Sequence, residues 1–151
     1  MHGAFERWAD DQACPERVEG IHALVDANGL PIMLKITPGH AADGRSAADM
    51  FGTLTKGDVL LADRAYDSDA LRSEMETRGV FTNVRLMPQR VRKPHFSASL
   101  YKLRNAVERF FSKIKHYRAI ATRYEKHPEN YLTLIKLASI RIWLRYNESV
   151  T

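Results

Sequence analysis

The sequence has little that could anchor it in a membrane or cross-link it covalently. Its single cysteine, Cys14, excludes an internal disulfide and fits a cytoplasmic setting. No apolar run approaches the roughly 20 residues of a membrane-spanning helix, and the N-terminus lacks the apolar region of a signal peptide. Internal repeats and low-complexity tracts are missing too. A chain of 151 residues with these features is expected to form one domain with a sizeable core.

Acidic side chains are scarce in the second half of the chain. Residues 85–151 hold 15 Lys and Arg against 4 Asp and Glu, whereas residues 1–84 hold 8 against 14. The charge is therefore segregated along the sequence. A basic half of this kind points to a polyanionic partner, nucleic acid above all. The alternative is a basic face that is merely solvated.

The first fifty residues change character near Ile21. Residues 1–20 show no sustained period and are expected to be irregular. Two apolar, β-branched runs follow, at 21–26 and 31–37, and the Asn-Gly pair between them is a strong hairpin signal. Asp26 falls at this turn, where Asp is a common turn residue. A catalytic role for Asp26 is the open alternative.

The remaining pattern predicts alternating helices and strands. They are a short helix at 46–54, a strand at 58–62, a helix at 67–78 with N-cap candidates at its start, a strand at 80–86, a basic loop at 87–99, a helix at 101–115 and a last helix that begins at Pro128. The last helix is rich in apolar residues and is expected to be largely buried. This order of elements predicts an α/β domain with a mixed sheet.

The stretch from Tyr101 to Lys115 contains no Gly or Pro to break a helix, and its polar residues recur at fixed intervals. At roughly 100° per residue, Tyr101, Arg104, Glu108 and Lys115 fall within an arc of about 60°. A separate apolar stripe is predicted to face the core, formed by Leu103, Val107, Phe110 and Ile114. The helix therefore presents one carboxylate among cations beside its buried face.

A second carboxylate, Asp63, directly follows the predicted strand at 58–62. Strand ends in α/β sheets open into crevices where ligands bind. Asp63 and Glu108 together could hold Mg²⁺ or Mn²⁺, and a pair of such ions can support phosphodiester chemistry. Tyr101, Arg104 and Lys115 could then position phosphates. The structural alternative is that Asp63 caps a turn and Glu108 pairs with the two cations along the helix.

These motifs resemble a known family. Tyr101, Arg104, Glu108 and Lys115 match the Y-(2)-R-(3)-E-(6)-K signature of bacterial insertion-sequence transposases of the DDE class, and LLADRAYDSD is similar to that family's segment around its second catalytic Asp. The hairpin and the C-terminal stretch also resemble the family, so that the likeness runs from about Ile21 to Arg145. It implies a ribonuclease H-like fold, an enzyme of DNA transposition and a divalent metal, Mg²⁺ or Mn²⁺.

The resemblance also implies roles for individual residues. Asp63 would be the second catalytic Asp and Glu108 the catalytic Glu, both binding metal, while the other three signature residues would support Glu108 and contact transposon-end DNA. His40 and Asp43 fall where the family often has polar residues. In the loop before the signature helix, DNA contact is favoured over simple solvation for Arg90, Arg92 and Lys93. Partners would be transposon-end and target DNA, with self-association as an oligomer.

One expected feature of the family is missing from the sequence. The family's first catalytic Asp lies on a strand before the hairpin, in a segment reading D-[SG]-T, and residues 1–20 contain no such segment. We therefore expect residues 21–147 to form the C-terminal part of a catalytic domain that lacks its first strand. The alternatives to an active transposase are an inactive remnant that only binds DNA or an intact transposase, and another ribonuclease H-like nuclease.

Overall fold

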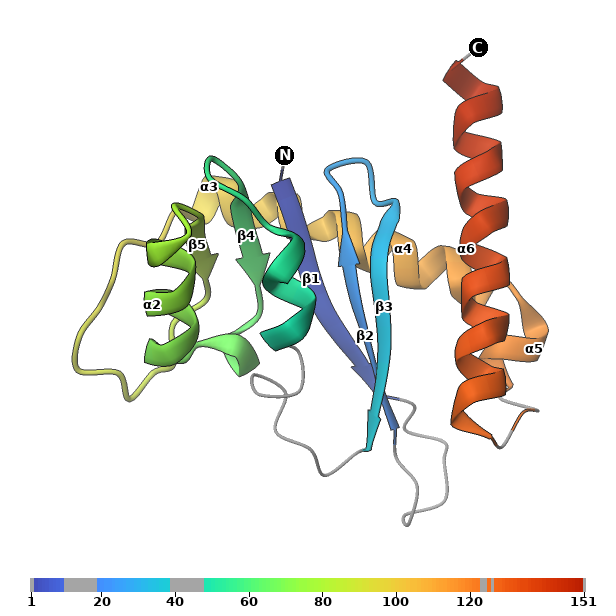
Figure 1. The fold of residues 1–151 in the computed structure, drawn as a ribbon, viewed down its shortest axis with the longest axis horizontal. Helices are drawn as coiled ribbons and strands as arrows, with labels where there is room; N and C mark the ends of the chain where they lie inside the picture. Colours follow the sequence, from blue (N-terminus) through green and yellow to red (C-terminus); the bar gives the residue numbers. More distant parts are fainter. Residues whose placement is uncertain (1, 10–18, 39–47, 123–124, 126, 151) are drawn as a thin grey trace.

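The centre of the structure is a five-stranded mixed sheet (Figure 1). The computed structural model describes residues 2–9, 19–38, 48–122, 125 and 127–150. The strand order is β3-β2-β1-β4-β5. The strands are β1 (His2–Ala9), β2 (Glu19–Val25), β3 (Pro31–Pro38), β4 (Val59–Ala62) and β5 (Phe81–Val84). The predicted α/β class with a mixed sheet is confirmed.

Strand β1 corrects the prediction for the N-terminus. Residues 1–20 were expected to be irregular and the first strand missing, yet His2–Ala9 forms the middle strand of the sheet. It pairs antiparallel with β2 and parallel with β4. The segment has only a weak apolar pattern of its own, so hydrogen bonding to strands on both sides decides its conformation. Pairing of this kind links residues far apart in sequence and leaves no local signal.

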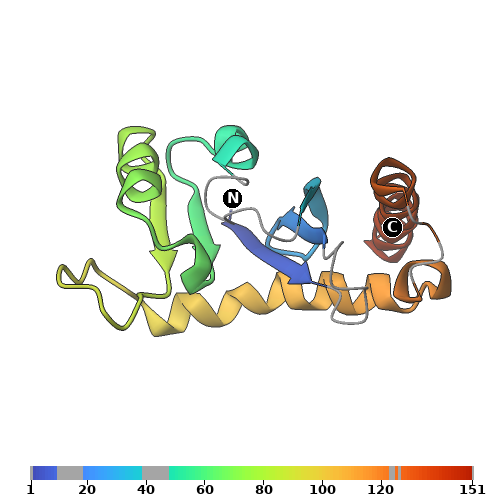
Figure 2. The ribbon, with the colours of Figure 1, turned by 90° about the horizontal axis from the view of Figure 1, so that it is seen from below.

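Helices cover the two faces of the sheet unequally (Figure 2). One face carries the 3₁₀ helix η1 (Ala48–Thr53) and α2 (Asp69–Thr77), and another 3₁₀ turn, η2 (Arg64–Tyr66), follows β4. A long rod crosses the other face, formed by α3 (Ala98–Tyr101), η3 (Lys102–Arg104) and α4 (Asn105–Lys115). The short α5 (Arg118–Ala121) and the long α6 (Pro128–Val150) complete the fold beside β3. The helices predicted at 67–78 and from Pro128 are confirmed. The described part of the segment predicted at 46–54 is the 3₁₀ helix η1, and the helix predicted at 101–115 is divided among α3, η3 and α4.

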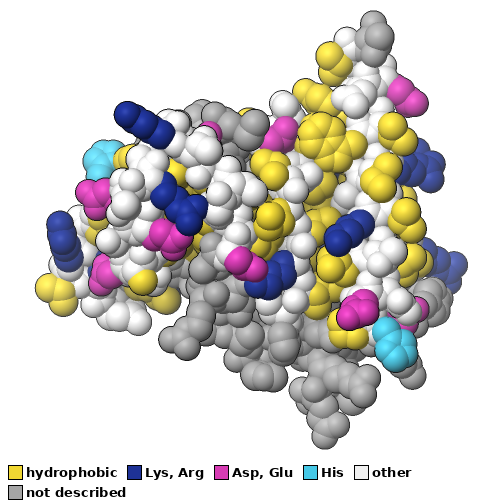
Figure 3. Space-filling model, in the orientation of Figure 1, with side chains coloured by type: hydrophobic (Ala, Val, Ile, Leu, Met, Phe, Trp, Pro, Cys, Tyr) yellow, Lys and Arg dark blue, Asp and Glu magenta, His cyan; other side chains and the backbone are white. Residues whose placement is uncertain are grey.

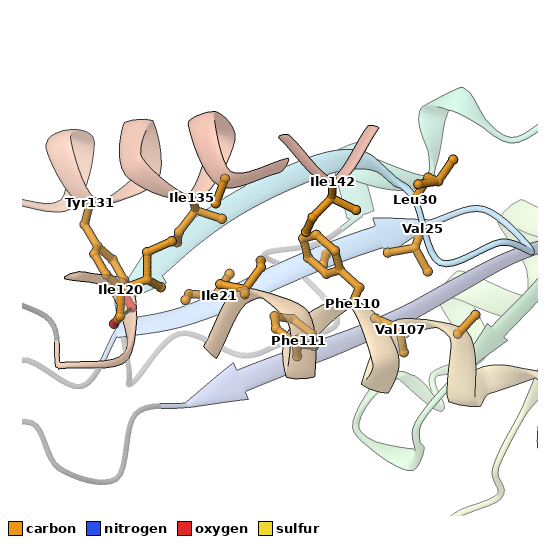
Figure 4. Packing of buried hydrophobic residues seen from close by; sticks show 14 of the residues in the cluster. Ile21, Val25, Leu30, Val107, Phe110, Phe111, Ile120, Tyr131, Ile135 and Ile142 are labelled. Carbon is orange, nitrogen blue, oxygen red and sulfur yellow. Dashed lines mark hydrogen bonds between the residues drawn. The ribbon is translucent and has the colours of Figure 1, made fainter. Parts of the chain in front are cut away.

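The core is divided into two clusters by the sheet. One cluster joins α4 and α6 to β2 and includes Ile21, Val107, Phe110 and Ile135 (Figure 4). The other lies under α2 and η1. Three members of the predicted stripe on the signature helix are buried, whereas Leu103 is 50% exposed. The sheet thus holds α4 by its apolar face and leaves the neighbouring polar edge accessible.

The hairpin between β2 and β3 touches the signature helix. Asp26 serves as the turn residue, because its Oδ1 accepts hydrogen bonds from the amides of Asn28 and Leu30. Gly29 has a φ of 78°, and a Cβ added there would lie 2.8 Å from the carbonyl oxygen of Ala106 in α4. Only a residue without a side chain allows the turn to approach the helix backbone so closely.

Helix α6 is buried on one side only, which corrects the expectation of a largely buried helix. Tyr131, Ile135 and Ile142 are at most 6% exposed, but Leu137 and Leu144 are each 57% exposed. The reason is geometric: α6 lies at the edge of the fold beside β3, and none of the described helices and strands covers its outer side (Figure 1). Figure 3 shows hydrophobic side chains along this exposed side. Among the described helices, none has both the length and the apolar character needed to cross a bilayer.

We predict that Gly29→Ala lowers the free energy of unfolding by about 2–4 kcal/mol, because it combines left-handed backbone strain with overlap against α4. Gly57→Ala is the matched control, since Gly57 has a φ of 94° and nothing within 4 Å of an added Cβ. It should cost only about 1 kcal/mol. Urea denaturation of the two variants measures the difference. Equal costs would show that the hairpin does not hold the helix.

Candidate active site

The site forms where the end of β4 meets the beginning of the rod. Asp63 directly follows β4 and caps η2, because its Oδ1 accepts a hydrogen bond of 2.7 Å from the amide of Arg64. The hydroxyl of Tyr101 also donates to Oδ1 of Asp63, at 3.4 Å. The structure thus brings together a strand residue and a helix residue that are 38 positions apart in the sequence.

Two further signature residues continue this series of contacts. The guanidinium of Arg104 lies over the ring of Tyr101, 5.3 Å from its centroid. The same guanidinium forms an ion pair with Oε1 of Glu108 one helical turn further along. Its side chain is only 15% exposed, whereas that of Glu108 is 49% exposed. Asp63, Tyr101, Arg104 and Glu108 therefore form one connected cluster with its outer carboxylate open to solvent.

The phenol of Tyr101 is kept protonated by its surroundings. Burial raises the pKa of Tyr101 above its ordinary value; the positive charge of Arg104 opposes this shift, and the nearby carboxylate of Asp63 adds to it. A tyrosine with a raised pKa remains a hydrogen-bond donor well beyond neutral pH. Tyr101 can therefore orient Asp63 without adding negative charge.

Lys115 lies on the same edge of the helix but further from the cluster. Lys115 follows Glu108 by seven residues, which is about 10 Å along the axis of α4. The two side chains are therefore two helical turns apart, whereas Arg104 and Glu108 are one turn apart. It is exposed near the C-terminal end of α4. The signature thus separates into a compact group around the two carboxylates and a more distant cation.

The three basic residues predicted in the loop have different surroundings. Arg90 is 13% exposed and forms ion pairs with Asp67, at 3.2 Å, and with Asp69. The side chain of Asp67 is fully buried and also accepts hydrogen bonds from Arg72 and from the amide of Met87. Arg90 therefore fastens the loop to the start of α2. Arg92 and Lys93 are exposed.

Other residues considered from the sequence do not join the cluster. His22 is buried and hydrogen-bonds through its two ring nitrogens to the hydroxyls of Tyr66 and Thr37, so it belongs to the core. Asp26 lies at the hairpin turn and is occupied there by backbone amides. His40 and Asp43 lie outside the described residues.

Comparisons with known proteins show the family of the chain. The family model described as "Transposase DDE domain" matches residues 2–143. The chain belongs to this transposase family.

Two curated relatives are insertion-sequence proteins. A protein of Brucella ovis designated a transposase for insertion sequence element IS6501 is 40% identical over 126 residues, which cover 83% of this chain and 97% of that protein. One of Burkholderia cepacia, designated a transposase for IS402, is 25% identical over 127 residues, covering 77% of this chain and 58% of that protein. The transposase function inferred from the sequence is thereby confirmed for the domain.

A solved structure supports the fold at greater distance. A chain of the simian T-cell lymphotropic virus intasome, determined by cryo-electron microscopy in complex with PP2A regulatory subunit B56 gamma, matches with a TM-score of 0.54 at 13% identity. The match covers 91% of this chain and 45% of that chain. At this identity the likeness shows the arrangement of the mixed α/β domain only.

The strand that sequence reasoning missed gives the transposase domain a further acidic residue near the site. In the pairing of β1 with β4, Phe5 is in register with Ala62, so Glu6 and Asp63 are each the next residue. In the pairing of β1 with β2, Glu6 is in register with Ala23, a member of the core cluster under α4. The register therefore places the backbone position of Glu6 beside that of Asp63. The absence of a D-[SG]-T segment had hidden this position.

We predict that Arg90→Ala lowers the free energy of unfolding by about 1–3 kcal/mol, because it removes one of the cations that neutralise the buried carboxylate of Asp67. Limited proteolysis should also cut the 87–97 loop faster. Arg92→Ala is the control, since Arg92 is exposed and removes the same charge from the same loop. Similar stability of the two variants would contradict the anchoring role of Arg90.

Proposed function

We propose that this chain is the ribonuclease H-like catalytic part of an insertion-sequence transposase that cleaves and joins DNA strands with Mg²⁺ or Mn²⁺. Asp63 and Glu108 are the metal-binding carboxylates in this proposal. The observation that carries it is the contact series from Asp63 through Tyr101 and Arg104 to Glu108, which connects the strand end to the helix. A strand order of 3-2-1-4-5 with β1 parallel to β4 supports the proposed fold.

The donor set fits a divalent cation in its chemistry. Carboxylate oxygens are the ligands that Mg²⁺ and Mn²⁺ prefer. The hydrogen bonds and the ion pair described above engage Oδ1 of Asp63 and Oε1 of Glu108, which leaves the second oxygen of each carboxylate available for an ion. Divalent ions bound there would activate a water or a 3′-hydroxyl and stabilise the leaving oxygen.

The proposed metal site needs a third carboxylate beside Asp63 and Glu108. Within the described residues, no three His, Cys, Asp or Glu side chains form a group that could hold a metal. We propose that Glu6 takes the position of the family's first Asp, because its position in the strand register is beside Asp63. Glu is one methylene longer than Asp and offers the same two oxygens.

The surrounding cations would position DNA. Arg104 stands between Tyr101 and Glu108, and its largely buried guanidinium would support the charge of Glu108 beside the DNA. Lys115 would contact the backbone further along the helix, and Arg92 and Lys93 would contact it from the exposed loop. The family acts on transposon ends and target DNA, and both, together with self-association as an oligomer, belong to this proposal. For Arg90, a DNA contact remains a prediction beside its ion pairs within the protein.

A second candidate function is that of an inactive remnant that binds DNA or an intact transposase without cleaving. The sequence of β1, which holds no Asp where the family has its first catalytic Asp, favours it. In both candidate functions the exposed basic residues would contact DNA. They differ in metal binding and in cleavage, and two experiments separate them.

We predict that the protein nicks transposon-end DNA in the presence of Mg²⁺ and that Glu108→Gln or Asp63→Asn lowers the rate at least ~100-fold, because each removes a metal-binding charge. Glu76→Gln, an exposed change on α2, is the control and should leave the rate unaltered. Nicking is followed on labelled duplex oligonucleotides. Equal rates for wild type and Glu108→Gln would remove Glu108 from the mechanism, and no nicking by wild type would favour the remnant.

We predict that Glu6→Gln weakens Mn²⁺ binding ~10-fold or more, measured from the electron paramagnetic resonance signal of free Mn²⁺. Circular dichroism confirms that the variant is folded, and Glu76→Gln is again the control. Unaltered affinity would show that Glu6 is not a ligand. If Glu6→Asp retains Mn²⁺ binding while Glu6→Gln does not, the carboxylate itself is required.

A further inference from the structure

A groove with a cavity volume of about 570 Å³ lies between the end of α4 and the C-terminal half of α6. Figure 2 shows α6 beside the far end of the rod from α3. The groove is lined by cations on both helices, namely Lys113, Arg141 and Arg145, and no Asp or Glu is among its lining residues. Its volume is within the range of about 300–1,000 Å³ typical of ligand sites.

Interactions within α6 do not explain the positions of Arg141 and Arg145. They are four residues apart on α6, so that two like charges lie on one face about 6 Å apart along the axis and repel each other. The C-terminal dipole of α4 can account for Lys113, but Arg141 and Arg145 lie before the last turn of α6. In the described part of the chain neither arginine pairs with a carboxylate, Glu148 included. Their charges are available to an anion from outside.

The remaining lining is mostly aromatic and apolar, and its two polar members, His116 and Ser149, hydrogen-bond to backbone carbonyls of the helical turn before them. Tyr117 and Tyr146 are half-buried and pack against the main core cluster, and Ile142 between the helices is 6% exposed. Aromatic side chains held by a core are suitable platforms for stacking unpaired bases, and the cations around them can bind the sugar–phosphate backbone. A free inorganic anion would contact the cations but would gain nothing from the aromatic side chains.

The groove is separate from the carboxylate cluster although α4 contributes to both. Lys113 follows Glu108 by five residues, which places the two side chains roughly 140° apart around the helix. Glu108 flanks one side of the buried stripe and Lys113 the other. A strand lying in the groove is therefore held away from Asp63 and Glu108.

We propose that this groove binds a single-stranded segment of DNA, with Arg141, Arg145 and Lys113 on its phosphates and the two tyrosines against its bases. The site binds a strand that is not being cut. The proposal rests on the proposed function only in taking DNA as the polyanion. It does not depend on metal or on cleavage.

The test uses the full chain and a labelled oligothymidine, with binding followed by fluorescence anisotropy across a salt series without divalent ions. The double variant R141A/R145A should lose ~10-fold or more in affinity, and its salt slope should fall by about 1.4, for two lost phosphate contacts to a single strand. The control K56A/K136A removes two exposed cations outside the groove and should bind as wild type. If both double variants lose the same affinity, the effect comes from net charge alone and the proposal is overturned.

A second measurement locates the bases. Photo-crosslinking of an oligonucleotide that contains iodouracil should attach it to Tyr117 or Tyr146, identified by mass spectrometry. Crosslinks confined to Tyr101, or equal affinity for duplex and single strand, would overturn the stacking role. Glu108→Gln should bind the oligothymidine as wild type does, so a failure of cleavage leaves this result interpretable. Loss of groove binding with intact nicking in R141A/R145A would show that the two sites act separately.

Discussion

Burial of one face of the α3–η3–α4 rod against the sheet is the interaction on which the rest of the structure depends. Val107, Phe110 and Ile114 are at most 1% exposed, and burial of each such side chain contributes about 1.5–3 kcal/mol. Because the rod crosses the sheet from the β4 side toward β3, this packing fixes where its polar edge lies. Glu108 is thereby connected to Asp63 at the end of β4 through Arg104 and Tyr101.

The carboxylates depend on the same packing for their charge balance. Arg104 is largely buried between the ring of Tyr101 and the carboxylate of Glu108, so the rod brings its own cation to the site. Tyr101 completes the connection to Asp63 as a neutral donor. A cluster arranged in this way is held together by protein contacts and still leaves the side chain of Glu108 half exposed to solvent.

Sequence patterns predicted those parts of the site whose conformation depends on neighbouring residues in the chain. The intervals in the signature helix fixed which residues share an edge, and the apolar run before Asp63 indicated a strand end. Strand β1 could not be predicted, because its conformation depends on partners on both sides rather than on its own residues. The anchoring of Arg90 by Asp67 and the one-sided burial of α6 were missed for the same reason: both are set by what packs nearby. Glu6 became a candidate only once the register was known.

The contact between Gly29 and Ala106 has a consequence for how this domain can be altered. The hairpin tip is a surface turn of the kind usually selected for inserting a tag or splitting a protein into fragments. Here the tip lies against the helix backbone two residues before Glu108, so an insertion would displace the polar edge of the helix that carries Glu108. The exposed loop around Val91, which is 99% exposed, is the safer point of attachment.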